Sequence, residues 1–377
     1  MSEPFVLPPY PYDRLSELIA AAEASPSATD GVGAVDLSIG TPCDPPPPAV
    51  VAALATSHAE RGYPPSIGTA AFRGAAARWV GRRFGVALEA SQVAACVGTK
   101  ELVAGLPHWL HLRDPEHDTV LYPAVSYPSY AMGASLAGCR AVPVPADAAG
   151  HMALDAISDG DAARALCLWI NSPANPTGAL DDLDAVAAWG RSRGVPVLSD
   201  ECYAEFTWAD APRTVLSSGT DGVLAVHSLS KRSNLAGVRA GFYAGDAELV
   251  RYLSEIRKHA GLMLPGPTQA AASVAFDDDA HVVEQRSRYR RRLEWLSDAL
   301  GRAGLDAPLP DGGFYLWVRA PGGDAWGLAR RLATEIGMIV SPGEFYGDAA
   351  PGHVRIAVVR PDEEIQRLVE RLAAVDW

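Results

Sequence analysis

Short apolar runs alternate with longer amphipathic stretches over roughly the first two thirds of the chain. Uninterrupted apolar runs of strand length are typical of strands that are buried on both faces of a sheet. Stretches with helical periodicity lie between several of them, for example 101–112, 183–193 and 247–259. This alternation predicts an α/β fold with a mostly parallel central sheet flanked by helices. The predicted strands are 93–97, 119–122, 141–144, 165–170, 195–199, 223–227 and 240–244.

The last third of the chain has a different pattern, with one long arginine-rich amphipathic stretch and only short apolar runs. This pattern predicts a smaller α+β domain, which we expect the N-terminal helix to join. We therefore predict a large domain over 31–270 and a small domain formed by 1–30 and 271–377. The elements expected outside the central sheet are helices at 12–24, 49–61, 278–303 and 325–336, and strands at 313–318, 338–340 and 354–358.

Composition and charge narrow the class of protein. The 377 residues include 32 Lys+Arg and 45 Asp+Glu, which gives a net charge of −13 and disfavours a nucleic-acid partner. No run of about 18 apolar residues predicts a membrane span, and the sequence Met1-Ser2-Glu3-Pro4 does not begin a secretory signal. The five cysteines show no CxxC pair or zinc spacing. We expect a reduced, cytoplasmic protein without a metal site.

The chain has only three lysines, Lys100, Lys231 and Lys258, so chemistry that needs an amine has few candidates. Lys231 follows the apolar run 223–229, at the end of a predicted strand, where its amine would point into the crevice at which α/β sheets bind ligands. Desolvation and neighbouring arginines would lower its pKa and make it nucleophilic enough to form a Schiff base. The alternative is a solvated helix position, which we expect for Lys258.

Polar residues follow two other predicted strands. Asp200 ends the strand 195–199, and Asn175 lies in the turn Asn-Pro-Thr-Gly after the strand 165–170. Asp200 could be a helix cap or a solvated strand end, and the Asn175 sequence is a turn signal by itself. At the ligand edge of a sheet, however, the carboxylate could pair with a protonated ring nitrogen and the amide could bind a ligand oxygen.

A strand passes through Gly98 into a helix that begins near Thr99 and Lys100. Backbone N–H groups and the helix dipole at such a junction can bind a phosphate, although one glycine is a weak signal. No GxGxxG and no GxxxxGK[ST] motif occurs, which disfavours a dinucleotide-binding dehydrogenase and an ATP-binding P-loop.

Taken in order, these elements resemble the class I/II aminotransferases, enzymes of fold type I that use pyridoxal phosphate (PLP). The resemblance extends from Leu37-Ser38-Ile39-Gly40-Thr41-Pro42 to His353-Val354-Arg355-Ile356. Its most specific part is Ser228-x-Ser230-Lys231 followed by Gly237-x-Arg239-x-Gly241. Stretches such as 98–102, 199–203, 257–261 and 342–347 are similar to the actinobacterial succinyldiaminopimelate aminotransferases.

The resemblance implies a role for each candidate residue. Lys231 would bind PLP covalently and shuttle the proton, Asp200 would pair with the ring nitrogen, and Tyr203 would hydrogen-bond the ring oxygen. The other residues that would bind the cofactor are Gly98, Thr99, Lys100, Ser228 and Arg239 at its phosphate, Asn175 and Tyr127 at its ring, and Tyr63 from the other subunit of a homodimer. Those that would bind the substrate carboxylate are Arg355, Gly40 and Asn175.

Three of these positions have a second interpretation. Tyr127 could be a core residue, and Lys100 could be a solvated helix residue or could contact the distal part of a substrate. Arg355 could belong to a structural ion pair. Lys100, Arg232, Lys258 or another arginine could bind a distal substrate carboxylate.

The resemblance implies a PLP-dependent aminotransferase that takes the amino group from glutamate, releases 2-oxoglutarate, and then aminates an acceptor in a second half-reaction. The expected acceptor is N-succinyl-2-amino-6-oxopimelate, the precursor of N-succinyl-diaminopimelate in lysine biosynthesis. The alternatives are an aminotransferase for another amino acid in a specialised pathway, a PLP β-lyase, or a PLP-binding regulator without turnover. Arg232 and Tyr243, which are bulkier than we expect in the subfamily, keep the substrate open.

Overall fold

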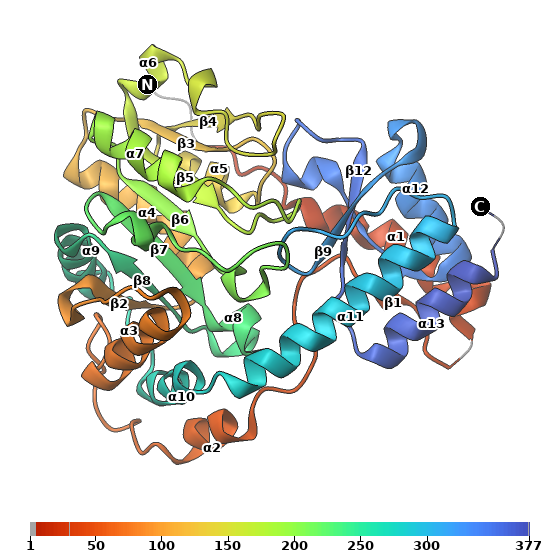
Figure 1. The fold of residues 1–377 in the computed structure, drawn as a ribbon, viewed down its shortest axis with the longest axis horizontal. Coiled ribbons are helices and arrows are strands. Elements are labelled where there is room, and N and C mark those ends of the chain that lie inside the picture. The colour runs from red at the N-terminus through yellow and green to blue at the C-terminus, as the bar shows by residue number, and fades with distance from the viewer. Residues whose placement is uncertain (1–4, 30, 376) are drawn as a thin grey trace.

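The computed structural model describes residues 5–29, 31–375 and 377. Residues 1–4, on which the expectation of no secretory signal rests, lie outside this part of the chain. Two bodies are visible in Figure 1: helices surround a large sheet in one, and a smaller group of strands and helices forms the other. The long helix α11 (Ala280–Arg302) extends from the first body along the second.

Within the described residues, a seven-stranded sheet forms the centre of the large body, in the order β2-β8-β7-β6-β5-β3-β4. β8 is antiparallel to both of its neighbours and the other pairs are parallel. This confirms the predicted α/β class with its mostly parallel sheet, and each predicted apolar run contains a strand. The strands are β2 (Val93–Cys96), β3 (Thr119–Pro123), β4 (Arg140–Val144), β5 (Ala165–Asn171), β6 (Val197–Asp200), β7 (Val223–Ser228) and β8 (Gly241–Gly245).

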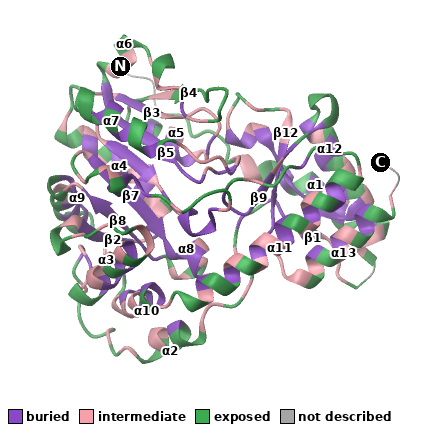
Figure 2. Ribbon diagram, in the orientation of Figure 1, coloured by how far each residue is buried: buried purple, intermediate pink, exposed green. Residues whose placement is uncertain are grey.

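Helices cover both faces of this sheet because successive residues of each buried strand point to opposite sides. Along β5, Leu168 and Ile170 belong to one apolar cluster, whereas Cys167 and Trp169 belong to the other. Figure 2 shows the strands as the buried centre of the body, with exposed residues on the outer surfaces of the helices. The helices of the first face are α3 (Ala70–Phe84), α7 (Leu183–Arg193) and α10 (Gly266–Asp277), and those of the second are α4 (Thr99–Arg113), α5 (Ser129–Leu136) and α9 (Ala247–His259).

The parallel strands bring three polar residues to one edge of the sheet. Asn171 ends β5 and is opposite Asp200, which ends β6. Asp200 in turn is opposite Val226, two residues before Ser228 at the end of β7. The short helix α8 (Leu229–Arg232) begins there and carries Lys231. The sheet therefore places the residues that the sequence singled out along one ligand-binding edge.

The smaller body has its own apolar core. β9 (Tyr315–Arg319) and β11 (Ser341–Pro342) both pair antiparallel with β12 (His353–Ala357), and β1 (Val35–Asp36) pairs parallel with β10 (Met338–Ile339). The helices that pack against this core are α1 (Ser16–Glu23), α11, α12 (Ala325–Arg331) and α13 (Asp362–Ala373).

The division into two domains stays a prediction, and the packing leads us to propose different boundaries from the predicted ones. β1 contributes Val35 to the small core although the predicted boundary at 31 assigns it to the large domain. α10 packs on α2 (Pro48–Thr56) and α3, although the predicted boundary at 270 divides it. We therefore propose that the large domain begins after β1 and ends with α10.

Local structure differs from the predictions in three places. The helix predicted over 49–61 ends at Thr56, because His58 has a positive φ of 53° and prolines follow shortly after. The helix predicted over 325–336 changes after Arg331 into a single π turn, Leu332–Ile336. α13 was not predicted, although Asp362, Glu363 and Glu364 are the acidic first turn expected of a helix start. No helix of the described residues is long and apolar enough to cross a membrane.

Candidate active site

A cavity of about 350 Å³ lies at the carboxyl edge of the central sheet, between the two bodies. Its volume is in the range of small-molecule sites. Four cationic side chains and one carboxylate are among the residues that line it, so the cavity is locally positive in a chain of net charge −13. The candidate residues that line it are Gly40, Thr99, Lys100, Tyr127, Asn175, Asp200, Tyr203, Ser228, Lys231, Arg239 and Arg355.

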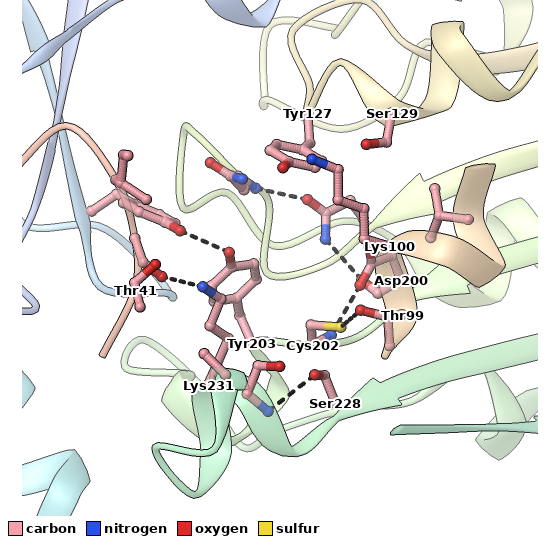
Figure 3. Close-up of a pocket in the computed structure, with 18 of the residues that line it drawn as sticks. Thr41, Thr99, Lys100, Tyr127, Ser129, Asp200, Cys202, Tyr203, Ser228 and Lys231 are labelled. Carbon is pink, nitrogen blue, oxygen red and sulfur yellow. Dashed lines mark hydrogen bonds between the residues drawn. The ribbon is translucent and has the colours of Figure 1, made fainter. Parts of the chain in front are cut away.

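Lys231 reaches from α8 into the cavity and donates a hydrogen bond to the carbonyl oxygen of Gly40 (Figure 3). Its ammonium also lies 5.7 Å from the centre of the Phe314 ring. Burial, together with the positive charge of Arg355, lowers the pKa of Lys231 to about 8. An appreciable fraction of this amine is therefore unprotonated and nucleophilic near neutral pH.

Asp200 is held by two hydrogen bonds. The hydroxyl of Tyr130 donates to Oδ2 at 2.9 Å, and the backbone N–H of Cys202 donates to Oδ1 at 3.2 Å. Burial raises the pKa of Asp200, while the bonds from Cys202 and Tyr130 oppose the rise. Among the described residues no cationic side chain forms an ion pair with it, so this carboxylate is suited to pair with a cationic ligand atom.

The other end of the cavity has the parts of an anion site. Gly98 caps α4 with a φ of +74°, and a Cβ atom there would lie 2.2 Å from Nη2 of Arg239. Only glycine thus allows the Arg239 guanidinium to lie against the start of this helix. Ser228 is buried nearby, and its hydroxyl accepts a hydrogen bond from the N–H of Ser230. A helix N-terminus, a guanidinium and a hydroxyl together can bind a phosphate.

Arg355 in β12 is 2% exposed and has no carboxylate within ion-pair distance among the described residues. Its Nη1 donates to Oδ1 of Asn175 at 2.8 Å and its Nη2 donates to the carbonyl of Ser38 at 2.5 Å, while Nε has no partner. Its guanidinium carbon lies 4.2 Å from the ring centre of Tyr315 and 4.8 Å from that of Tyr346. The structural ion pair that was the alternative interpretation is therefore absent from this part of the chain, and the cation is suited to bind a ligand carboxylate.

Tyr203 and Lys100 lie at two further sides of the cavity (Figure 3). The Tyr203 hydroxyl is 2.7 Å from that of Tyr315, and burial raises the Tyr203 pKa well above its usual value, so this phenol stays protonated. The Lys100 ammonium donates to the hydroxyl of Tyr10 at 3.2 Å and lies over the ring of Tyr127. Burial acts to lower the Lys100 pKa, but Tyr127 and Tyr10 outweigh it and raise that pKa. Lys100 therefore remains cationic.

Three residues considered from the sequence lie elsewhere. Arg232 points away from the cavity, where it pairs with Glu205 at 3.2 Å and Asp279 at 3.1 Å. Lys258 lies on the exposed face of α9, as predicted, within 3.7 Å of Glu255. Tyr63 is 96% exposed and does not line the cavity, so its expected contact with the phosphate of a second subunit stays a prediction.

Comparison with known proteins identifies the family. The family model "Aminotransferase class I and II" matches residues 32–372. The chain belongs to the class I and II aminotransferases. It is a PLP-dependent transaminase of fold type I, as the resemblance implied.

The individual relatives differ in substrate. The chain is 44% identical to a probable aminotransferase of Mycobacterium tuberculosis, over 97% of this chain and 85% of the relative. It is 41% identical to the 4-dedimethylamino-4-oxo-anhydrotetracycline transaminase OxyQ of Streptomyces rimosus, over 97% and 99%. Among solved structures, a probable N-succinyldiaminopimelate aminotransferase of Thermus thermophilus matches with a TM-score of 0.83 and 32% identity, over 95% and 99%.

The residues that line the cavity fit the cofactor of this family. The amine of Lys231 and the carboxylate of Asp200 match the aldehyde and the ring nitrogen of PLP, and Gly98 leaves room at the phosphate site for Arg239. The Nε of Arg355 has no hydrogen-bond partner among the described residues, so the guanidinium keeps an unused N–H donor.

Several residues that contact the candidate site were missed in the sequence. Tyr130 binds Asp200, 70 positions further along the chain, and Tyr315 binds Tyr203, 112 positions away. Neither has a charged residue beside it in the sequence that would mark it. The only local signal is the spacing of three residues from Tyr127 to Tyr130, which places two tyrosines on one face of a helical turn.

Proposed function

We propose that this aminotransferase moves the amino group of glutamate to N-succinyl-2-amino-6-oxopimelate, with 2-oxoglutarate released in the first half-reaction. The observation that carries the proposal is a pair of cations, Arg355 and Lys100, that line the cavity and that no carboxylate of the described residues neutralises. Arg355 has no carboxylate partner among the described residues, and Lys100 is bonded to a neutral phenol. A substrate with two separated carboxylates would give both cations a partner.

In this proposal each residue acts through the atom that the structure directs into the cavity. Arg355 binds the α-carboxylate and so orients the substrate Cα toward Lys231, whose unprotonated amine takes the Cα proton. Asp200 keeps the ring nitrogen protonated, and Tyr203 donates to the ring oxygen. Bound PLP supplies the aldehyde that accepts the amino group and the electron-poor ring that absorbs the electron pair left at Cα.

Lys100 is the residue that we propose for the distal carboxylate. Its ammonium lies between Tyr10 and Tyr127, 4.9 Å and 5.5 Å from the two ring centres, and no carboxylate of the described residues pairs with it. The similarity to the solved structure of a probable N-succinyldiaminopimelate aminotransferase from Thermus thermophilus supports a long dicarboxylic acceptor.

A second candidate function is amination of a ketone in a specialised pathway. The relative OxyQ, a transaminase of a tetracycline precursor, is 41% identical over 99% of its length. The aromatic rings of Tyr10, Tyr12 and Tyr127 at the cavity wall are also compatible with a large planar acceptor.

The test is to load the protein with PLP, add a panel of amino acids, and follow the visible absorption band of the cofactor. Glutamate should remove the band, and N-succinyl-2-amino-6-oxopimelate should restore it. If no amino acid removes the band, transamination by this site is wrong. If glutamate removes it and only an aromatic ketone restores it, the specialised function replaces the proposed one.

A Lys100→Met variant sharpens the choice of acceptor. Loss of one charged hydrogen bond should raise the KM for the succinylated acceptor about tenfold to a hundredfold, and leave the KM for a monocarboxylic keto acid within about threefold. Lys258→Met is the matched control because Lys258 is an exposed lysine on α9. Equal effects on both acceptors would exclude Lys100 as the distal group.

We also propose a cytoplasmic homodimer in which Tyr63 reaches the phosphate site of the partner. The exposed side chain of Tyr63 supports this proposal, because a large aromatic ring that is 96% exposed is suited to be covered by a second subunit. Tyr63→Phe should weaken PLP binding without changing the mass measured by sedimentation.

A further inference from the structure

Tyr315, at the start of β9, touches three residues of the candidate site although no role follows for it from the sequence. It is 1% exposed and lines the cavity. Its hydroxyl is 2.7 Å from the hydroxyl of Tyr203, and its ring centre is 4.2 Å from the guanidinium carbon of Arg355. A Cβ atom on Gly40, whose carbonyl accepts from Lys231, would lie 2.2 Å from the same hydroxyl.

The ring and the hydroxyl of Tyr315 serve different neighbours. The ring of Tyr315 packs against the Arg355 guanidinium, with its centre 4.2 Å from the guanidinium carbon, and the ring of Tyr346 packs against the same group at 4.8 Å. The Nη1 and Nη2 bonds to Asn175 and Ser38 leave little freedom for rotation of this group. Without the Tyr315 ring, the cation would lose one of its two aromatic contacts and its orientation would be less restricted.

The hydroxyl of Tyr315 has Tyr203 as its hydrogen-bond partner. Burial raises the pKa of Tyr315 to about 12 and also raises the pKa of Tyr203 well above its usual value, so both phenols keep their protons at neutral pH. Only one of the two protons can lie between the two oxygens. If Tyr315 donates, the proton of Tyr203 is free to be donated to a ligand oxygen in the cavity.

We propose that Tyr315 is a positioning residue that couples the substrate-carboxylate site to the Tyr203 phenol: its ring orients Arg355, and its hydroxyl donates to Tyr203 and so directs the Tyr203 proton into the cavity. This inference rests on the proposed function, in which Arg355 binds the substrate carboxylate and Tyr203 donates to the ring oxygen of PLP. It adds a link between the two that neither residue provides alone.

The variants Tyr315→Phe and Tyr315→Leu separate the two contributions. In the PLP-loaded protein, Tyr315→Phe should raise the pH midpoint of the visible absorption band by about half a unit to one unit, because a weaker Tyr203 donor stabilises the deprotonated chromophore less. Its KM for glutamate should stay within about threefold of the parent. Tyr315→Leu should give the same midpoint shift and also raise that KM by up to about thirtyfold, because the ring over Arg355 is lost.

Tyr346→Phe is the matched control. The Tyr346 ring also packs against Arg355, but its hydroxyl bonds to Tyr12 and Ser341 instead of Tyr203. The pH midpoint of the visible absorption band should therefore be the same in Tyr346→Phe as in the parent. In a Tyr203→Phe background, Tyr315→Phe should add no further shift, because the hydroxyl acts only through Tyr203.

An unchanged or lowered midpoint in Tyr315→Phe would overturn the proposed direction of the hydrogen bond. An unchanged KM in Tyr315→Leu would overturn the role of the ring. The band and its midpoint need only bound cofactor, so they can be measured even if no amino donor reacts. Failure of the proposed function, seen as a band that no donor removes, is thereby distinguished from failure of this inference.

Discussion

Two buried arginines of this protein, Arg292 and Arg355, have different kinds of partner. In the small body, Arg292 is 1% exposed and both of its Nη atoms lie 2.7 Å from Asp44, while its Nε lies 2.6 Å from Asp362. At the cavity, Arg355 is 2% exposed and bonds to an amide oxygen and a carbonyl oxygen. Two arginines of nearly equal burial thus differ in whether the protein itself supplies a carboxylate.

The difference has a physical consequence. When a buried guanidinium pairs with two carboxylates, its charge is already neutralised within the protein. Such a group stabilises the fold only while all of its charged partners are present. A guanidinium that has only neutral oxygen partners keeps most of its attraction for an anion, which a substrate carboxylate can satisfy. The same contrast separates Lys231, whose pKa is lowered to about 8, from Lys258, which pairs with Glu255 on the surface. We therefore expect variants of the cavity cations to change catalysis and variants of the paired cations to change stability.

Removal of the cavity amine should have the largest effect. Lys231→Ala should abolish the visible band of the PLP-loaded protein and lower kcat for transamination by at least about 10²- to 10⁴-fold, because the proton shuttle is lost. Lys258→Ala should leave both unchanged. A band that survives in Lys231→Ala would show that another amine binds the cofactor.

Removal of a paired cation should instead lower the free energy of unfolding. Arg292→Ala leaves the largely buried carboxylate of Asp44 without its ion-pair partner and leaves Asp362 paired with Arg291 alone. We expect it to cost about 3–5 kcal/mol in urea unfolding. The KM for glutamate should stay within about twofold. Arg302→Ala on the same helix is the control, because the Arg302–Asp298 pair is exposed and should contribute less than about 1 kcal/mol. If Arg292→Ala unfolds like the parent, the paired group is not structural.

The pH dependence of the free energy of unfolding tests the lowered pKa of Lys231 directly. Its pKa is about 8 in the folded protein and 10.5 ordinarily, so between these values the unfolded chain binds more protons and stability rises with pH. In the cofactor-free protein, Lys231→Met should therefore be more stable than the parent by about 3 kcal/mol at pH 7. This difference should shrink as the pH approaches 10.5. Urea unfolding at pH 7 and pH 10 measures it, and a difference independent of pH would contradict the lowered pKa.

The smallest expected effect is on PLP binding through Asp200, the carboxylate that lines the cavity without a cationic partner among the described residues. Tyr130→Phe removes one of the two hydrogen bonds to Asp200 and should raise the dissociation constant of PLP by about three- to tenfold, which is about 1 kcal/mol. Titration of the cofactor-free protein measures this constant. Tyr122→Phe, on the adjacent strand β3 and outside the cavity lining, is the control. Equal constants for Tyr130→Phe and the parent would mean that Cys202 alone orients the carboxylate.

The sequence predicted the α/β class and the strands well because the apolar runs are nearly continuous, and the runs 165–170, 195–199 and 223–227 are each followed by a polar residue. Lys231, Asp200 and Asn175 could be found for the same reason, since each follows such a run. Arg232 could not be separated from Lys231 in this way. Successive residues on a helix differ by about 100°, and this turn of α8 directs Arg232 to Glu205 instead of the cavity.

The tyrosines around the site could not be predicted, because their positions depend on how distant segments meet. Tyr315 reaches Tyr203 only after β9 of the small body packs against the large body, and Tyr10 reaches Lys100 from the N-terminal segment. The spacing of these residues along the sequence does not indicate either contact. The choice between a paired and an unpaired arginine depends on the same long-range packing, which is why Arg355 kept two interpretations until the structure was known.

The binding of glutamate to Arg355 variants tests the central claim most directly. The dissociation constant of glutamate can be measured from the loss of the visible band in the PLP-loaded protein, for Arg355→Gln and for Arg292→Gln. Because Arg355 has no carboxylate partner among the described residues, we expect Arg355→Gln to weaken glutamate binding about a hundredfold. We expect Arg292→Gln to change this binding by less than about twofold. Equal constants for Arg355→Gln and the parent would contradict the assignment of Arg355 as the carboxylate receptor.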